Sequence, residues 1–232
     1  MGGENGRPPG QAAARRGACP ILKTKLNRRL LLLIASLGVM IPFAAPYFTF
    51  DPANSRVDIA PGSLRFPLLI AHIAFAFAAM LAGFAQFSGR LRARRPGLHR
   101  IVGRVYVASV GAAGLLALPL AGYMDDFSKA TGFLALALAW LFTAWKGWRG
   151  ALRRDFDAHR IWMLRSFGIT LVAVSGRLLV PVLLLTYGLL HGFTLPAGRE
   201  GMVEAVLNVN IWAGLVANFA VVEWVLLKPK KS

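Results

Sequence analysis

The sequence predicts an all-α polytopic membrane helix bundle with six transmembrane helices, in which helices 2–5 form the core. Three observations lead to this prediction. The composition is 56% hydrophobic over 232 residues, the apolar residues gather in six long runs, and the basic residues concentrate on one side of those runs. Each run is long enough to cross a hydrocarbon core of about 30 Å. The runs are 30–48, 66–88, 101–123, 131–148, 161–190 and 203–227.

Charge sorting predicts the topology. When the six runs are threaded alternately through a membrane, 22 of the 27 Lys and Arg residues fall on one side. That side holds residues 1–29, the segments 90–104 and 146–165, and the C-terminal tail. By the positive-inside rule, both termini are cytoplasmic and the protein is a multi-pass protein of the cell membrane. The opposite side holds four basic residues, and a fifth lies deep in a run: Arg56, Arg65, Lys129 and Arg199, then Arg177.

The sequence divides into three parts. Residues 1–29 form a basic cytoplasmic tail, rich in Gly, Pro and Arg, which we expect to be disordered. Residues 30–227 form the transmembrane domain, and residues 228–232 form a second basic cytoplasmic tail. The first run could be read as a cleaved signal peptide, but it is longer than a usual signal core, so we expect a retained helix.

The formal net charge of +17 would suggest a nucleic-acid partner in a soluble protein. Here the basic residues flank apolar runs, where they set orientation and meet anionic lipid headgroups. We therefore predict the lipid bilayer with anionic headgroups as the partner, and no nucleic acid.

The first three apolar runs differ in their composition and in their ends. The first run carries Pro42 and Pro46 near its outer end. The second run is rich in Ala, Gly and Phe, and small residues permit close packing of helices. The third run ends at a short polar connection, PLAGYMDD.

The last three runs follow the same alternation. The fourth ends in Trp145 and Trp148, and indoles favour the headgroup zone. The fifth, 161–190, contains Pro181, which we expect to kink it. The sixth, 203–227, ends directly before the basic tail.

Two inner loops repeat one pattern 60 residues apart. Each reads two arginines, three or four residues, and then His-Arg-Ile; the copies are RRPGLHRI (94–101) and RRDFDAHRI (153–161). The repeat predicts that helices 2–3 and 4–5 are tandem copies, with helices 3 and 5 parallel and starting on the same side. A chance match between two basic loops is the alternative.

Several segments together resemble a family of bacterial membrane proteins known as domain of unknown function 2306. The resemblance covers roughly residues 66–227, and a bacterial family implies the cell inner membrane. This family has no settled activity to carry over. The segments are His72 in the second run, GFAQFSGRLR (83–92), LHRIVGRVYV (98–107), AHRIWMLRSFGIT (158–170), SGRLLVP (175–181) and NFAVVEW (218–224).

The layout more loosely resembles the b-type di-haem transmembrane cytochromes, in which one histidine pair joins the third and fifth helices near the cytoplasm. That likeness implies His99 and His159 as ligands of haem b, and imidazole is a good axial ligand for haem iron. Arg100 and Arg160 would hold the haem propionates. The second histidine pair of those cytochromes is missing, because the fourth run has no histidine. The alternative role of these His-Arg pairs is anchoring to lipid phosphate.

A second set of polar residues is predicted to form an interior polar cluster: His72, Arg177, Glu204 and Asn208. Arg177 lies about sixteen residues into the fifth run, and a charge at such depth normally faces the bundle interior. We expect Arg177 to contact Glu204 or Asn208, with His72 close by. The cluster is either a site for a proton or a small-molecule ligand, or a buried ion pair that fixes packing.

Two functions stay open. One is a small redox carrier that binds a b-type haem, which requires His99 and His159 to face each other. The other is a small-molecule or proton-coupled transporter or sensor, which requires a water-accessible cavity through the Arg177 cluster. The sequence contains no Walker loop and no G-x-S-x-G or H-E-x-x-H motif, so it assigns no enzyme class.

Overall fold

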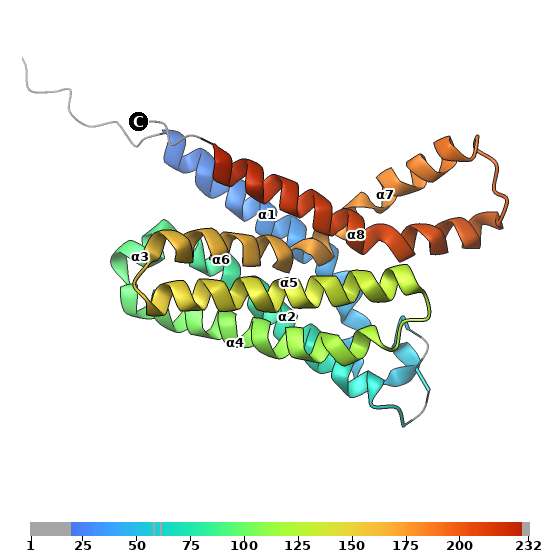
Figure 1. The fold of residues 1–232 in the computed structure, drawn as a ribbon, viewed down its shortest axis with the longest axis horizontal. Helices are drawn as coiled ribbons and strands as arrows, with labels where there is room; N and C mark the ends of the chain where they lie inside the picture. Colours follow the sequence, from blue (N-terminus) through green and yellow to red (C-terminus); the bar gives the residue numbers. More distant parts are fainter. Residues whose placement is uncertain (1–19, 58, 61, 229–232) are drawn as a thin grey trace, which may run out of the picture.

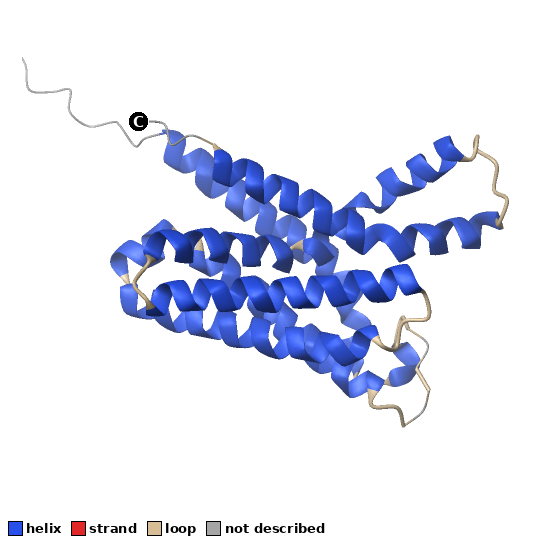
Figure 2. Ribbon diagram, viewed as in Figure 1, coloured by secondary structure: helices blue, strands red, loops and turns tan. Residues whose placement is uncertain are grey.

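The computed structural model describes residues 20–57, 59–60 and 62–228, and over these residues it contains helices, turns and loops (Figure 2). The remaining parts of the two predicted tails lie outside the described residues. The elements are α1 (Pro20–Ala44), η1 (Ala45–Thr49), η2 (Pro52–Asn54), α2 (Arg65–Gln86), α3 (Gly89–Arg94), α4 (Pro96–Ala121), α5 (Phe127–Leu152), α6 (Phe156–Thr170), α7 (Val172–Leu190) and α8 (Gly198–Leu227).

Six helical segments of the described chain are long and apolar enough to cross a membrane, which confirms the predicted number. The helix bearing the first span begins at Pro20, earlier than predicted, although its apolar part starts at Arg29. The spans are Arg29–Thr49, Arg65–Gln86, Pro96–Ala121, Phe127–Leu152, Val172–Leu190 and Gly198–Leu227.

The core is an up-and-down bundle of α2, α4, α5 and α6 (Figure 1). The pairs α2–α4, α4–α5 and α5–α6 pack side by side, and α6 closes the ring against α2. Helices α4 and α6 therefore lie on one diagonal and start at the same end. All buried members of the main apolar cluster come from these four helices: Ala79, Ala82, Tyr106, Val110, Ala113, Trp140, Ala144 and Phe167. The core is therefore formed by predicted helices 2–4 and the inner part of the predicted fifth helix, whereas its outer part, residues 172–190, packs outside the core.

We call the end where α4 and α6 begin the inner end, because the arginine-rich connections lie there. Helix α3 joins α2 to α4 at this end, and the tight turn between α5 and α6 lies beside it (Figure 1). The start of α1 and the end of α8 lie at the same end, as an even number of spans requires. Arg29 on α1 donates a hydrogen bond to the Phe87 carbonyl, which ties the first span to the inner end of α2.

The fifth apolar run differs from its prediction. We expected one helix over 161–190 with a kink at Pro181, but the chain breaks at Leu171 and α7 runs through Pro181 without interruption. Beyond the break, α7 and the outer half of α8 splay away from the core (Figure 1).

Side chains explain why the break falls at Leu171. In lipid, a carbonyl that loses its helical partner needs another donor. Thr170 donates to the Ser166 carbonyl at 3.0 Å, and Asn218 on α8 donates to the Gly168 carbonyl at 2.8 Å. Ser175 also donates from its hydroxyl to the Leu171 carbonyl at 3.2 Å, in addition to the helical bond from its backbone N–H at 3.0 Å. Hydroxyls that bond back to a preceding carbonyl are known to bend helices.

Helices α1, α7 and α8 pack outside the core, as predicted for the first and last spans. Helix α8 lies against α5, α6 and α7, and α1 lies against α7 and α2. The α7–α8 crossing is a backbone contact, because a Cβ added at Gly214 would meet Gly176 N at 2.9 Å and Val172 O at 3.1 Å. This crossing holds the splayed arm to the rest of the molecule.

We predict that Gly214→Ala destabilises the protein and that Gly111→Ala does not. The new methyl group at Gly214 would force α7 and α8 apart, at a cost of about 1–3 kcal/mol for overpacking. Gly111 on α4 has open space where a Cβ would lie, so alanine there should raise stability by about 0.5–1 kcal/mol through helix propensity. Denaturant unfolding in detergent micelles measures both. Equal stability of the two variants would contradict the backbone crossing.

Candidate functional site

The two histidines of the repeated motif occupy equivalent positions at the inner end. His99 donates its backbone N–H to the Arg95 carbonyl at 3.0 Å, and His159 donates to the Asp155 carbonyl at 2.9 Å. Arg95 and Asp155 are the N-cap residues of α4 and α6. Both imidazoles therefore project from the fourth residue of two parallel, diagonally opposed helices, at matching depth in the bundle.

The surroundings of the two rings differ. Nδ1 of His159 is hydrogen bonded to the Gly147 carbonyl on α5 at 2.8 Å. A carbonyl only accepts, so Nδ1 carries the proton and Nε2 keeps its lone pair. Nδ1 of His99 is buried and has no hydrogen-bond partner among the described residues.

The close approach of α5 and α6 sets the position of His159. A Cβ added at Gly150 would lie 2.9 Å from the His159 backbone N, so only glycine permits this contact. On the other side, Gln86 of α2 donates from its side-chain amide to the His99 carbonyl at 2.8 Å. Each histidine is thus held through its backbone by a neighbouring helix.

Arg100 and Arg160 directly follow the histidines and are exposed. Neither forms an ion pair with a described residue. The ion pair that the described residues do form is Arg165–Glu223, with Nε to Oε1 at 2.7 Å and a second bond at 3.1 Å, which joins α6 to α8. The two arginines after the histidines are therefore available to an anionic group from outside the described protein.

A buried hydroxyl network lies deeper on the same diagonal, and sequence reasoning missed it. The Tyr106 hydroxyl lies 2.8 Å from Ser166 Oγ and 3.0 Å from Thr170 Oγ1, and Trp140 donates to Thr170 Oγ1 at 3.0 Å. Tyr106 is 1% exposed and Ser166 is fully buried. A signal was available, since Tyr106 and Ser166 each stand seven residues after a motif histidine.

The proton positions in this network follow from counting its hydrogen-bond donors and acceptors. Thr170 has one hydroxyl proton, which goes to the Ser166 carbonyl at 3.0 Å. Tyr106 must then donate to Thr170, and the Ser166 hydroxyl must donate to Tyr106. Every donor is used, and the network is complete without water.

The predicted cluster of His72, Arg177, Glu204 and Asn208 is not assembled. No hydrogen bond or ion pair joins these four side chains within the described part of the chain. His72 Nδ1 bonds the Ala113 carbonyl on α4 at 2.9 Å. Glu204 is exposed and Asn208 is half-buried on α8.

The partner of Arg177 is a backbone carbonyl instead of an acid. Arg177 donates to Ala173 O at 2.7 Å, and its guanidinium lies 4.5 Å from the ring centre of Phe43 on α1. The physical reason is the break at Leu171, which turns α7 toward α1 and away from α2. An intramembrane arginine is satisfied here by a carbonyl and an aromatic face.

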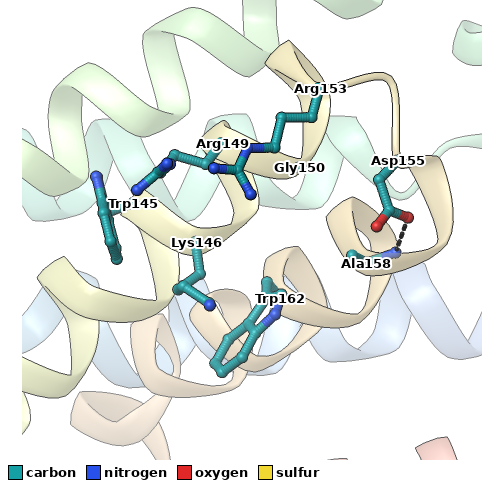
Figure 3. Close-up of a pocket in the computed structure, with 8 residues that line it drawn as sticks. All are labelled: Trp145, Lys146, Arg149, Gly150, Arg153, Asp155, Ala158 and Trp162. Atoms are coloured by element: carbon teal, nitrogen blue, oxygen red, sulfur yellow. Dashed lines mark hydrogen bonds between the residues drawn. The ribbon is translucent and has the colours of Figure 1, made fainter.

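A cavity of about 180 Å³ opens at the inner end between α5 and α6 (Figure 3). We call it the cationic cavity, because three of the residues that line it are basic. Sequence reasoning used these residues only as markers of topology. The lining residues are Trp145, Lys146, Arg149, Gly150, Arg153, Asp155, Ala158 and Trp162.

In the part of the chain that the structure describes, no group of three His, Cys, Asp or Glu side chains could hold a metal ion. A haem iron needs only two protein ligands, because the porphyrin supplies the others.

The fold and the polar inner end define an integral membrane helix bundle. Residues 69–226 match the family described as predicted membrane proteins, DUF2306. The match spans more than half of the chain, so the protein belongs to this family, as its segments predicted. No curated protein and no solved structure matches the chain.

We predict that Tyr106→Phe destabilises the protein more than Tyr187→Phe does. Loss of the Tyr106 hydroxyl leaves the Ser166 hydroxyl without its acceptor, at a cost of about 0.6–2 kcal/mol for an interhelical bond in a membrane protein. Tyr187 stacks on His191 through its ring, which phenylalanine keeps. Thermal unfolding in one detergent compares the two. A Tyr106 variant as stable as the control would contradict the network.

Proposed function

We propose that this protein is a small redox carrier of the membrane that holds a b-type haem between His99 and His159. The observation that carries the proposal is that two histidines occupy equivalent positions on diagonally opposed helices of the bundle, together with a buried ring nitrogen on His99 that no described residue satisfies. Buried polar atoms without a partner are rare and call for an explanation, such as an ion or a ligand.

The ring of His159 suits a ligand role. Its Nδ1–H bond to the Gly147 carbonyl fixes the tautomer and leaves Nε2 free to donate its lone pair. Metal-ligating histidines commonly donate their other ring N–H to a carbonyl in this way. His99 supplies the second imidazole from the opposite helix. Two imidazole ligands favour electron transfer over oxygen activation, because they leave no open position on the iron.

Packing limits where the haem fits. One turn beyond His99, the Gln86 amide covers Gly103, because a Cβ added there would lie 3.6 Å from it, at ordinary van der Waals distance. On α5, a Cβ at Gly147 would lie 2.6 Å from the Met163 sulfur. The interior is therefore filled directly beyond both histidines. The haem would lie at the extreme inner end of the bundle, where exposed Arg100 and Arg160 would hold its propionates by charge-assisted bonds. When bound, it supplies a one-electron redox couple.

The alternative function, a transporter or sensor, is supported by fewer observations. Its best observation is the helix break at Leu171, because broken helices line substrate sites in many transporters. The polar side chains around this break are engaged with the carbonyls of α6 and α7, and the cationic cavity is not lined by Arg177. A structural role explains the break.

The location of the protein also forms part of the proposal. We infer a cell-membrane protein with both termini in the cytoplasm, because the start of α1 and the end of α8 lie at the end of the bundle that carries the arginine-rich connections. Its exposed arginines would meet anionic headgroups there. If the protein is a redox carrier, the small-molecule ligand predicted from the sequence is the haem itself.

The haem proposal predicts a coloured protein. Full-length protein produced with added haem should show a sharp Soret band and sharp visible bands on reduction, the sign of a six-coordinate iron. His99→Ala and His159→Ala should each abolish these bands.

His191→Ala is the matched control, because His191 lies in the connection between α7 and α8 at the opposite end and bonds Tyr187. It should leave the spectrum unchanged. Colourless wild-type protein, or unchanged bands in both motif variants, would remove haem from the account.

The topology predicts the side of each loop. A periplasm-dependent phosphatase fused after residue 126 should be active, and a cytoplasm-dependent fluorescent protein fused after residue 155 should fluoresce. Fusions after residues 93 and 232 should behave like the one after 155. A C-terminal fusion that reads the outer side would overturn the six-span arrangement.

A further inference from the structure

The cationic cavity between α5 and α6 has a chemistry that the haem proposal does not use. We propose that it binds the phosphate ester of an anionic phospholipid, whose acyl chain lies along the exposed face of α5. The site would be stoichiometric and specific, unlike the general attraction of a basic surface for a membrane.

The cavity walls pair cations with indoles. Lys146 Nζ lies 5.4 Å from the ring centre of Trp162, and the Arg149 guanidinium lies 5.0 Å from that of Trp145. These contacts hold both cations against flat apolar walls at the mouth of the cavity (Figure 3). Arg153 adds a third cation from the C-cap of α5. Ordered cations in a concave wall make a better anion site than mobile surface lysines do.

The charges of the cavity are not neutralised from within. Its one carboxylate, Asp155, accepts the Ala158 backbone N–H at 3.0 Å as the N-cap of α6 (Figure 3). Lys146, Arg149 and Arg153 form no ion pair with any described residue. Three cations against one carboxylate leave a positive site, which a phosphodiester anion would complement.

The size of the cavity and the surface beside it favour a lipid over a soluble phosphate ester. About 180 Å³ is less than the roughly 300–1,000 Å³ of sites that enclose a drug-sized ligand. The rest of the ligand must therefore lie outside. Leu138, Phe142 and Trp145 are 52%, 50% and 48% exposed and form one stripe along α5, at helical spacing, that leads to Arg149.

The stripe is continuous with the cavity wall. The Phe142 ring lies 6.1 Å from Trp145 and 5.6 Å from Trp162, centre to centre. An acyl chain on this stripe would deliver its headgroup phosphate to the cavity at the inner end. Tryptophan also favours this interfacial depth in membranes.

The test is a titration of the detergent-solubilised full chain with dioleoyl phosphatidylglycerol, with bound lipid counted by native mass spectrometry. Wild type should bind one lipid ahead of all others, and dioleoyl phosphatidylcholine, which has no net charge, should bind at least about tenfold more weakly. The combined variant Lys146→Gln, Arg149→Gln, Arg153→Gln should lose the first lipid, with affinity lower by at least about tenfold.

The matched control is Arg90→Gln, Arg94→Gln, Arg95→Gln, which removes the same charge from α3 and its C-cap residue at the same end of the bundle. These three side chains are exposed and lie outside the cavity. The control should bind within about twofold of wild type. If the cavity variant fails to fold, Arg149→Gln measured against Arg94→Gln takes its place, because both side chains are exposed.

Three further results would overturn the proposal. Equal loss in the cavity and α3 variants would show general attraction to a basic surface instead of a site. Glycerol 3-phosphate or inorganic phosphate displacing the lipid at similar concentration would assign the cavity to a soluble phosphate ester. Binding of phosphatidylcholine as tight as that of phosphatidylglycerol would remove the role of the three cations.

Discussion

The Tyr106 hydroxyl is bonded to Ser166 and Thr170 across the diagonal of a bundle that offers it no water, and the rest of the core depends on this contact. A hydroxyl left unpaired there would cost more than any single apolar contact nearby contributes. The bonds therefore fix the axial register of α4 against α6. His99 and His159 lie seven residues, about 10 Å, nearer the inner end on the same two helices. The register set by the hydroxyls thus brings the histidines to one level.

The same requirement for internal partners shapes the outer half of the molecule. The break at Leu171 is tolerated because Thr170, Ser175 and Asn218 supply donors to the carbonyls around it. Arg177 joins this set through the Ala173 carbonyl, so the one deeply placed basic residue stabilises the break instead of forming an ion pair. Helix α7 turns away from the core, and the close contact between Gly176 and Gly214 holds it against α8. A continuous fifth helix would have kept Arg177 near α2.

Features that repeat along the chain could be predicted from the sequence, whereas features that depend on a single contact could not. The six spans follow from apolar runs, and the equal depth of His99 and His159 follows from the repeated motif. The break at Leu171 could not be placed, because its donors include Asn218, nearly 50 residues away. Pro181 was the stronger local signal and was misleading. The cationic cavity also needed the structure, since it depends on the approach of α5 to α6 at Gly150.

The most direct measurement of the central claim is a double-mutant cycle on Tyr106 and Ser166. Unfolding free energies of Tyr106→Phe, Ser166→Ala and the double variant give the coupling between the two side chains. A direct bond in a dry bundle predicts a coupling of about 0.6–1.7 kcal/mol. Effects that add to within about 0.3 kcal/mol would mean that the two hydroxyls do not meet, and the shared level of the two histidines would lose its structural basis.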